Sequence, residues 1–404
     1  MNRIVRKYIE FLRQPDVARL LLSALLTRMP VGMVSFAMLM FLHEAMGNFT
    51  LAGSAVGISM VALAACAPIQ GRVVDLYGPK RLLAVTAVVQ PLALLATLAS
   101  AKLGLSFAVV TGCAIVSGMF ASPITTLTRT VWRHRFDRED DRRTAFALDS
   151  VAIEVNFTLG PALVAVVLAT AGATAAFAMA IGFVVLAMAV FLGSGALRYV
   201  TRETGMKRHL LGPLREPGLW LVFVATFGLT LSFGLLEVGY PAYATALALP
   251  ALGGVLLAIN AVGSALGGAL YGGLHFRMPV ERQFAWAAGL MALPLLLHAV
   301  LLDHPFAFGV VAFFAGVLIA PSIAAQSVLV SRIAPSHYAT EAFTWSSTFI
   351  VSGLGTGMAL GGMLAESVGL RYAFIAGGVI VALVALVALA IPARAAAPAA
   401  RAAD

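Results

Sequence analysis

The sequence predicts an all-α integral membrane protein with about twelve transmembrane helices in two pseudo-repeated six-helix bundles. The 404-residue chain is 61% hydrophobic and only 11% charged, whereas soluble domains carry roughly 45–50% apolar and about 25% charged residues. Its mean hydropathy is +0.95. About twelve apolar segments reach the roughly 20 residues that a helix needs to cross a bilayer. These three observations exclude an ordinary soluble domain.

The apolar segments follow one another along nearly the whole chain. We expect helices at residues 18–42, 50–70, 81–101, 104–128, 144–170, 173–197, 218–242, 250–273, 284–302, 305–330, 339–365 and 371–392. The first segment is not typical of a cleavable signal peptide, because it is long, contains Arg28 and lacks a small-residue cleavage site. Residues 393–404 are rich in Ala and Pro and are expected to form a disordered cytoplasmic tail.

Basic residues gather on one side of the expected membrane spans. Of the 27 Lys and Arg, 24 lie on the side of the N-terminus, whereas Lys102 and Arg371 lie on the other side and Arg28 lies within a span. The positive-inside rule therefore predicts a multi-pass protein of the inner (plasma) membrane with both termini in the cytoplasm. Because topology accounts for the net charge of +9, no nucleic-acid partner is expected.

An internal repeat divides the chain into two halves. The long polar connection at 198–217 separates an N-terminal bundle, 1–197, from a C-terminal bundle, 218–392. Identical residues recur 197 positions apart in five pairs, which are Gly57 and Gly254, Gly71 and Gly268, Gly160 and Gly357, Gly172 and Gly369, and Phe177 and Phe374. Two homologous six-helix halves are typical of transporters that rock one half against the other around a midplane site.

The connection after the second span reads GRVVDLYGPKRLL, from Gly71 to Leu83. It resembles the signature of the major facilitator superfamily, although Leu76 and Pro79 depart from it. The residues that carry the match are Gly71, Asp75, Gly78, Lys80 and Arg81. The resemblance implies a secondary transporter in which this loop is a gating latch on the cytoplasmic side. In the second half the position of Asp75 is occupied by Gly272, so the latch is expected on one side only.

Two charged residues are expected near the middle of the membrane. Arg28 and Glu154 each lie about ten residues into a span, at a depth of ~15 Å. The family resemblance places the first and fifth helices side by side, so the two residues are expected to pair. Two interpretations stay open: a permanent ion pair, or a substrate-binding or proton-coupling site in which Glu154 changes protonation or Arg28 grips an anion. Asp149 lies shallower, at ~8 Å.

Two further polar residues are candidates for substrate binding or proton coupling. Glu237 lies toward the outer end of the seventh span, next to glycines and Pro241 that can break the helix. An acid at the outer headgroup level is the alternative interpretation. Gln326 lies in the tenth span, and the family resemblance implies that this span lines the central cavity.

The sequence predicts a transporter rather than an enzyme. It has no nucleotide-binding loop and no His, Cys and Asp pattern with metal spacing, so neither a cofactor nor a metal is expected. Gly160-Pro161 resembles a motif on the fifth helix of antiporters of the superfamily, which indicates an efflux-like branch, although Asn156 replaces a preceding motif glycine.

The leading hypothesis is proton-coupled export of a small organic molecule, such as a drug, a metabolite or a siderophore-like compound. The alternatives are proton-symport uptake of an organic anion, a lipid flippase and a non-transporting receptor. The expected partners are a small-molecule substrate, protons and the lipid bilayer, and the protein is expected to be monomeric.

Overall fold

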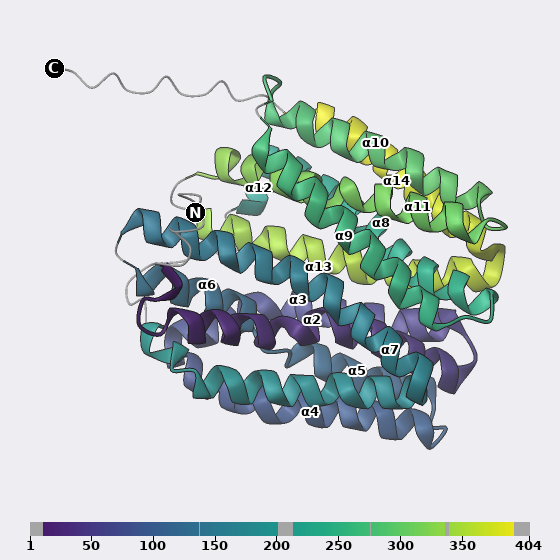
Figure 1. Cartoon of the computed structure of the whole chain (residues 1–404), viewed down its shortest axis with the longest axis horizontal. Helices are drawn as coiled ribbons and strands as arrows, with labels where there is room; N and C mark the ends of the chain where they lie inside the picture. Colours follow the sequence, from purple (N-terminus) through teal and green to yellow (C-terminus); the bar gives the residue numbers. More distant parts are fainter. Residues whose placement is uncertain (1–10, 137, 201–212, 275, 336–338, 392–404) are drawn as a thin grey trace.

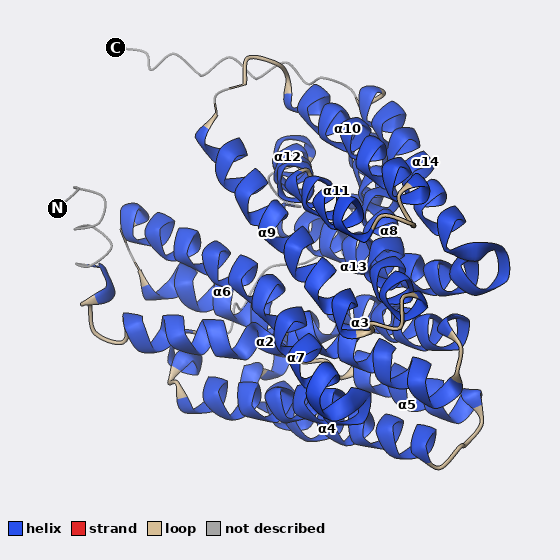
Figure 2. Cartoon of the chain, turned by 45° about the vertical axis from the view of Figure 1, so that its right-hand side comes forward, coloured by secondary structure: helices blue, strands red, loops and turns tan. Residues whose placement is uncertain are grey.

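The computed structural model of the chain describes residues 11–136, 138–200, 213–274, 276–335 and 339–391. Some side chains within the helices, including those of Asp75 and Glu154, are not described. The expected tail at 393–404 and most of the expected central loop lie outside the described residues. The described residues form helices and connections without a strand (Figure 2), so the predicted all-α membrane fold is confirmed.

The N-terminal helices are α2 to α7, and the C-terminal helices are α8 to α14. The first group comprises α2 (Val17–Met46), α3 (Phe49–Tyr77), α4 (Pro79–Lys102), α5 (Phe107–Met119), α6 (Ile124–Arg135) and α7 (Glu139–Gly193). Two short helices, η1 (Ala196–Tyr199) and η2 (Pro213–Arg215), lie between the groups. The second group comprises α8 (Pro217–Ala246), α9 (Ala251–Gly273), α10 (Val280–Val300), α11 (Pro305–Val317), α12 (Ile319–Ile333), α13 (Ala339–Leu364), η4 (Ala365–Gly369) and α14 (Leu370–Leu389).

Ten helical stretches within the described residues are long and apolar enough to cross a membrane. Two of them, Val155–Gly193 with 39 residues and Glu341–Leu389 with 49, are each about twice as long as one crossing requires. Each contains a glycine with a positive φ, Gly172 (φ 84°) and Gly369 (φ 116°), a conformation that interrupts the helix. The count of twelve spans stays a prediction, and the long stretches are compatible with it.

Two helices are broken where the sequence predicted continuous spans. The expected span at 104–128 is divided between α5 and α6 by the segment Phe120–Pro123, and the span at 305–330 is divided between α11 and α12 at Leu318. Gln70 on α3 donates to the carbonyl oxygens of Met119 and Ala121 at 2.8 and 3.0 Å, and Gln90 accepts from the Ser122 amide at 3.2 Å. These side chains satisfy backbone groups that the break leaves without helical partners.

Two of the glycine pairs, Gly160 with Gly357 and Gly57 with Gly254, occupy corresponding places in the two groups of helices. Gly160 on α7 packs against Gly32 on α2, and Gly357 on α13 packs against Gly234 on α8. Gly57 and Gly254 both lie where an N-terminal helix meets a C-terminal one. The 197-residue offset therefore reflects equivalent packing positions.

Two seams join the N-terminal and C-terminal helices: α3 packs on α13, and α7 packs on α9 (Figure 1). In the first seam a Cβ at Gly53 or Gly57 would lie against the α13 backbone at Met358 or Gly355. In the second seam a Cβ at Gly254 would lie against Pro161 and Ala165. Small residues thus allow backbones of the two groups to approach closely.

We call one end of the molecule the basic face and the other end the opposite face, according to the connections that each end carries. The opposite face carries the connections at 47–48, 103–106, 247–250 and 301–304, and the basic face carries the described connecting residues 78, 136, 138, 194–200, 213–216, 274 and 276–279. Both seams close near the opposite face. Toward the basic face, a Cβ at Gly71 on α3 would meet no neighbouring atom within 4 Å, whereas Gly57 on the same helix is tightly packed. The two groups of helices therefore converge at the opposite face and separate toward the basic face.

Candidate functional site

The candidate site begins with a buried ion pair between α2 and α7. Arg28 is 2% exposed and Asp149 is 1% exposed. The Arg28 Nη1 and Nη2 atoms donate to the two Asp149 carboxylate oxygens at 2.5 and 3.1 Å. This bidentate geometry is the arrangement in which a guanidinium and a carboxylate bind most strongly. It also lowers the cost of holding either charge at membrane depth.

Asp149 differs from the partner that the sequence predicted for Arg28. That prediction took the fifth span to begin at residue 144, but α7 begins at Glu139. Asp149 is therefore ten residues into its helix, as Arg28 is eleven residues into α2, so each lies ~15 Å along its helix from the N-terminal end. Among the described side chains Arg28 pairs with Asp149, and the expected Arg28–Glu154 pair is not tested. The Glu154 side chain is outside the described side chains, and its role stays a prediction.

Asp149 accepts from more than one donor. The Trp132 indole N–H on α6 donates to Oδ1 at 2.9 Å, and the Arg129 Nε lies 3.9 Å from Oδ2. The Arg129 side chain is 59% exposed, so solvent screens its attraction. Asp149 therefore joins α2, α6 and α7 through one carboxylate.

Close backbone packing continues from this network along α2 and α7. Asn156 on α7 donates to the Leu25 carbonyl on α2 at 3.1 Å. A Cβ at Gly160 would lie 3.2 Å from the Gly32 Cα, and one at Gly32 would lie 2.9 Å from the Asn156 carbonyl oxygen. The Gly160-Pro161 pair thus lies at a helix contact, where glycine permits the short approach.

Glu237 is a carboxylate of a different kind. It lies on α8, where it is partly exposed although Leu236 and Val238 on either side are buried. Among the described residues it has no hydrogen bond or ion pair. Thr226 and Thr230 on the same helix are buried, and their hydroxyl groups donate to the α8 carbonyl oxygens of Val222 and Thr226, respectively. Its role in substrate binding or proton coupling stays a prediction.

Gln326 does not face an open interior in this structure. Its side chain is 0% exposed, and its amide donates to Ser346 on α13 at 2.8 Å. Its oxygen also accepts from Ser327 at 3.4 Å. The bond to Ser346 fastens α12 to α13, and a role in substrate binding stays a prediction.

The gating motif lies at the basic face. Gly71 and Asp75 are on the last turns of α3, and Lys80 and Arg81 are exposed on the first turn of α4. Gly78 alone connects these helices, with φ 81° and ψ 160°, a conformation that favours glycine. The motif therefore makes a sharp turn, while its gating role stays a prediction.

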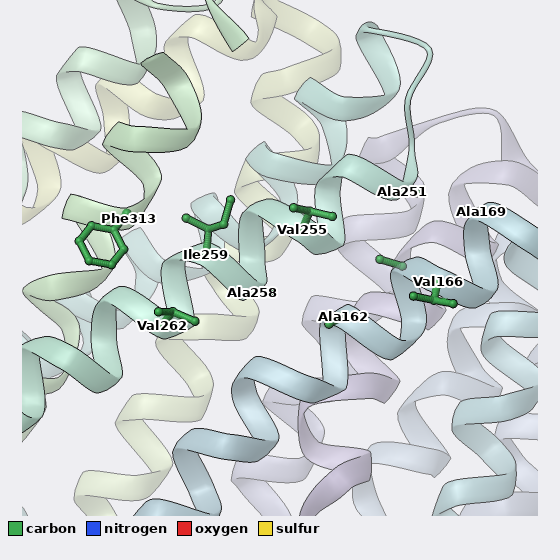
Figure 3. A pocket seen from close by; sticks show the side chains of 10 residues that line it. Ala162, Val166, Ala169, Ala251, Val255, Ala258, Ile259, Val262 and Phe313 are labelled. Carbon is green, nitrogen blue, oxygen red and sulfur yellow. The ribbon is translucent and has the colours of Figure 1, made fainter. Parts of the chain in front are cut away.

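Sequence reasoning missed one feature, an apolar cavity of about 510 Å³ beside the seam of α7 and α9 (Figure 3). Its lining includes Ala162, Val166 and Ala169 from α7 and Val255 and Ile259 from α9. The cavity offers no polar side chain to a coupling ion. Only the small residues on both helices could have suggested it.

The comparisons with known proteins concern the whole chain. The model of the Major Facilitator Superfamily matches two overlapping stretches, residues 20–349 and 222–403. No curated protein matches the chain.

Several solved structures share the fold at low sequence identity. A bacterial homologue of the iron transporter ferroportin in its inward-facing state has a TM-score of 0.72 at 16% identity, over 93% of this chain and 98% of that one. A bacterial ferroportin homologue in the outward-facing state has a TM-score of 0.65 at 16% identity, over 93% and 99%. A POT family transporter in complex with 5-aminolevulinic acid has a TM-score of 0.71 at 13% identity, over 92% and 95%.

The family model matches most of the chain, which establishes the family of the protein, and the similar structures agree with this family. Together they support a secondary transporter that is not an enzyme. The chain belongs to the major facilitator superfamily.

Proposed function

We propose that this protein is a proton-coupled secondary transporter of the inner membrane that exports a small organic molecule by alternating access. Glu237 carries the proposal. An acid within a membrane span is a functional candidate by default, and Glu237 has no described ion pair or hydrogen bond that would fix its charge. It can therefore bind and release a proton without breaking a structural contact. Glu154 is the second candidate, on the strength of its position in α7.

The Arg28–Asp149 pair has a supporting role in this proposal. Two nitrogens of the Arg28 guanidinium are used by Asp149, and the side chain is buried. A substrate carboxylate would have to displace Asp149 to reach them. The pair is thus better suited to holding α2, α6 and α7 together than to gripping an anion.

The proposed topology rests on the distribution of charge, and the proposed conformational state rests on the packing of the helices. The positive-inside bias places the basic face in the cytoplasm, so closure at the opposite face describes an inward-facing state. The higher TM-score against the inward-facing relative supports this assignment. In the proposed cycle the protein is a monomer with two six-helix halves, residues 1–197 and 218–392, and twelve spans in total. The two halves rock against each other about the seams.

A membrane-span carboxylate without a described partner favours an amphipathic or cationic substrate, since Glu237 would attract it. Gly160-Pro161 adds support for an efflux-like antiporter, because the dipeptide resembles the fifth-helix motif of the superfamily's antiporters, and it lies where α7 packs on α2. In such an antiporter substrate and proton compete for the same carboxylate, so proton entry drives substrate release to the outside.

One observation favours uptake of an organic anion as the second candidate function. Arg129 on α6 is 59% exposed and is only 3.9 Å from Asp149 through Nε. Its terminal nitrogens are better placed than those of Arg28 to meet a carboxylate from the basic side. An anion carrier would depend on Arg129 rather than on Glu237.

The test uses proteoliposomes with an imposed pH gradient and two probes, the amphipathic cation rhodamine 6G and the anion fluorescein. We expect gradient-driven accumulation of rhodamine 6G, which Glu237→Gln abolishes while exchange without a gradient persists. Glu154→Gln is tested alongside, and Asp303→Asn, in the exposed connection before α11, is the control. Full gradient-driven flux in both Gln variants would refute the coupling assignment. Fluorescein flux that is lost in Arg129→Gln would establish the anion carrier instead.

A further inference from the structure

Two hydrogen bonds join the N-terminal helices to the C-terminal helices among those described. The Phe49 amide donates to Glu366 Oε1 at 2.7 Å, and the Thr50 hydroxyl donates to the Gly362 carbonyl at 3.3 Å. Both lie at the opposite face, on the seam of α3 and α13. They must therefore break if this face opens.

The Glu366 carboxylate occupies a position that suits its charge. Phe49 is the first residue of α3, and the first four amides of a helix have no partner within it. Asn48 on the same chain segment accepts from Leu51 at 3.1 Å, while Glu366 accepts from Phe49 across the seam. A carboxylate at a helix N-terminus is stabilised by the helix dipole as well as by the hydrogen bond.

The local structure presents Glu366 to α3. Glu366 lies in η4, a π-helical turn between α13 and the positive-φ residue Gly369. Such turns are uncommon and occur often at functional sites. On the other side, the His43 ring stacks on the Phe49 ring, with centroids 3.7 Å apart and planes at 12°, which fixes the first turn of α3.

The second seam has no equivalent acid. The residue 197 positions before Glu366 is Ala169, which lines the apolar cavity between α7 and α9 together with Ala251 (Figure 3). One seam thus ends in a charged contact and the other in an apolar one. The asymmetry indicates that the contact at Glu366 is additional to the packing that both seams share.

We propose that Glu366 is a gate residue, whose carboxylate holds the opposite face closed by capping the N-terminus of α3. This role rests on the proposed alternating-access function. Because α3 and α13 run antiparallel, Asp75 near the end of α3 and Glu366 just after α13 stand at corresponding places at the two faces. Glu366 is thus the opposite-face counterpart of the latch that the motif predicts at the basic face.

The gate is tested by the distance across the opposite face, measured without substrate by electron–electron resonance between spin labels at Leu105→Cys and Leu249→Cys. These exposed residues lie in the connections after α4 and α8, and Cys66 and Cys113 are replaced by Ala. We expect Glu366→Ala to raise the ratio of open to closed molecules by about 3- to 10-fold. Glu366→Gln, which keeps an acceptor but loses the charge, should give an intermediate shift.

Ser367→Ala is the matched control, because Ser367 is exposed and in the described structure bonds only to the Met363 carbonyl, one turn earlier at the end of α13, at 2.6 Å. Thr50→Val removes the other cross-seam bond and should shift the ratio less than Glu366→Ala. An unchanged distance distribution in Glu366→Ala, or an equal change in Ser367→Ala, would overturn the gate. The readout needs no transported molecule, so absence of gradient-driven flux in the wild-type protein would count against the proposed function and not against the gate.

Discussion

At the scale of single residues, the carboxylate of Asp149 keeps Arg28 in the interior. Arg28 has two bonds to it, while its buried Nε has no described partner. Trp132 supplies a further bond to the same carboxylate. A buried pair of this kind contributes little beyond a well-packed apolar pair, but removing one member leaves an uncompensated charge.

We therefore predict that Asp149→Asn lowers the free energy of unfolding by about 3–5 kcal/mol. Thermal unfolding of the detergent-purified protein, followed by circular dichroism, measures the change. The double variant Arg28→Met with Asp149→Leu should recover most of the loss, because it removes both charges. Arg129→Gln is the control and should change stability by less than about 1 kcal/mol, since its charge is exposed. A double variant less stable than Asp149→Asn would contradict this account.

The sequence predicted an acidic partner for Arg28 in the fifth span, but it did not single out Asp149, which is the partner among the described side chains. Hydropathy located the start of the fifth span at the first apolar residues, whereas α7 begins in the polar segment at Glu139. That difference of five residues separates Glu154 from Asp149. Gln326 illustrates the same limit, because only tertiary structure shows that it bonds to Ser346.

At the scale of elements, helix breaks depend on side chains from other helices. The α5–α6 break exposes the carbonyl groups of Met119 and Ala121, both of which accept from Gln70. Hydropathy cannot detect such a break, because the apolar composition continues through it. Pro123 and Pro321 are the only local signals at the two breaks. The two positive-φ glycines, in contrast, follow from the repeat.

We predict that Gln70→Leu destabilises the protein by about 1–3 kcal/mol for each carbonyl group left without a partner. Since the effect is structural, the midpoint of thermal unfolding should fall in the absence of any substrate. Ser117→Ala serves as the control: it lies in α5, and its hydroxyl bonds only to Ala114 of its own helix at 2.8 Å in the described structure. Equal midpoints for Gln70→Leu and Ser117→Ala would show that the break does not depend on Gln70.

At the scale of the whole molecule, the conformational state is set by where the two groups of helices touch. The sequence predicted the all-α membrane fold, because hydropathy encodes it, while the twelve-span count, the topology and the two-bundle division stay predictions. It could not predict the state, since glycines at both ends of α3 look alike in sequence. Gly57 contacts α13, but Gly71 has open space around it.

This difference gives opposite predictions for two variants of one helix. Gly57→Leu would press a side chain against the Gly355 backbone, so it should open the opposite face and lengthen the distance between labels at Leu105→Cys and Leu249→Cys. Gly71→Leu meets nothing within 4 Å in this state, but it would obstruct closure of α3 onto α13 at the basic face. It should therefore lower the fraction of molecules in which the opposite face is open. Shifts in the same direction for both variants would exclude rocking about the α3–α13 seam, because a rigid rocking motion closes one end of a seam as it opens the other.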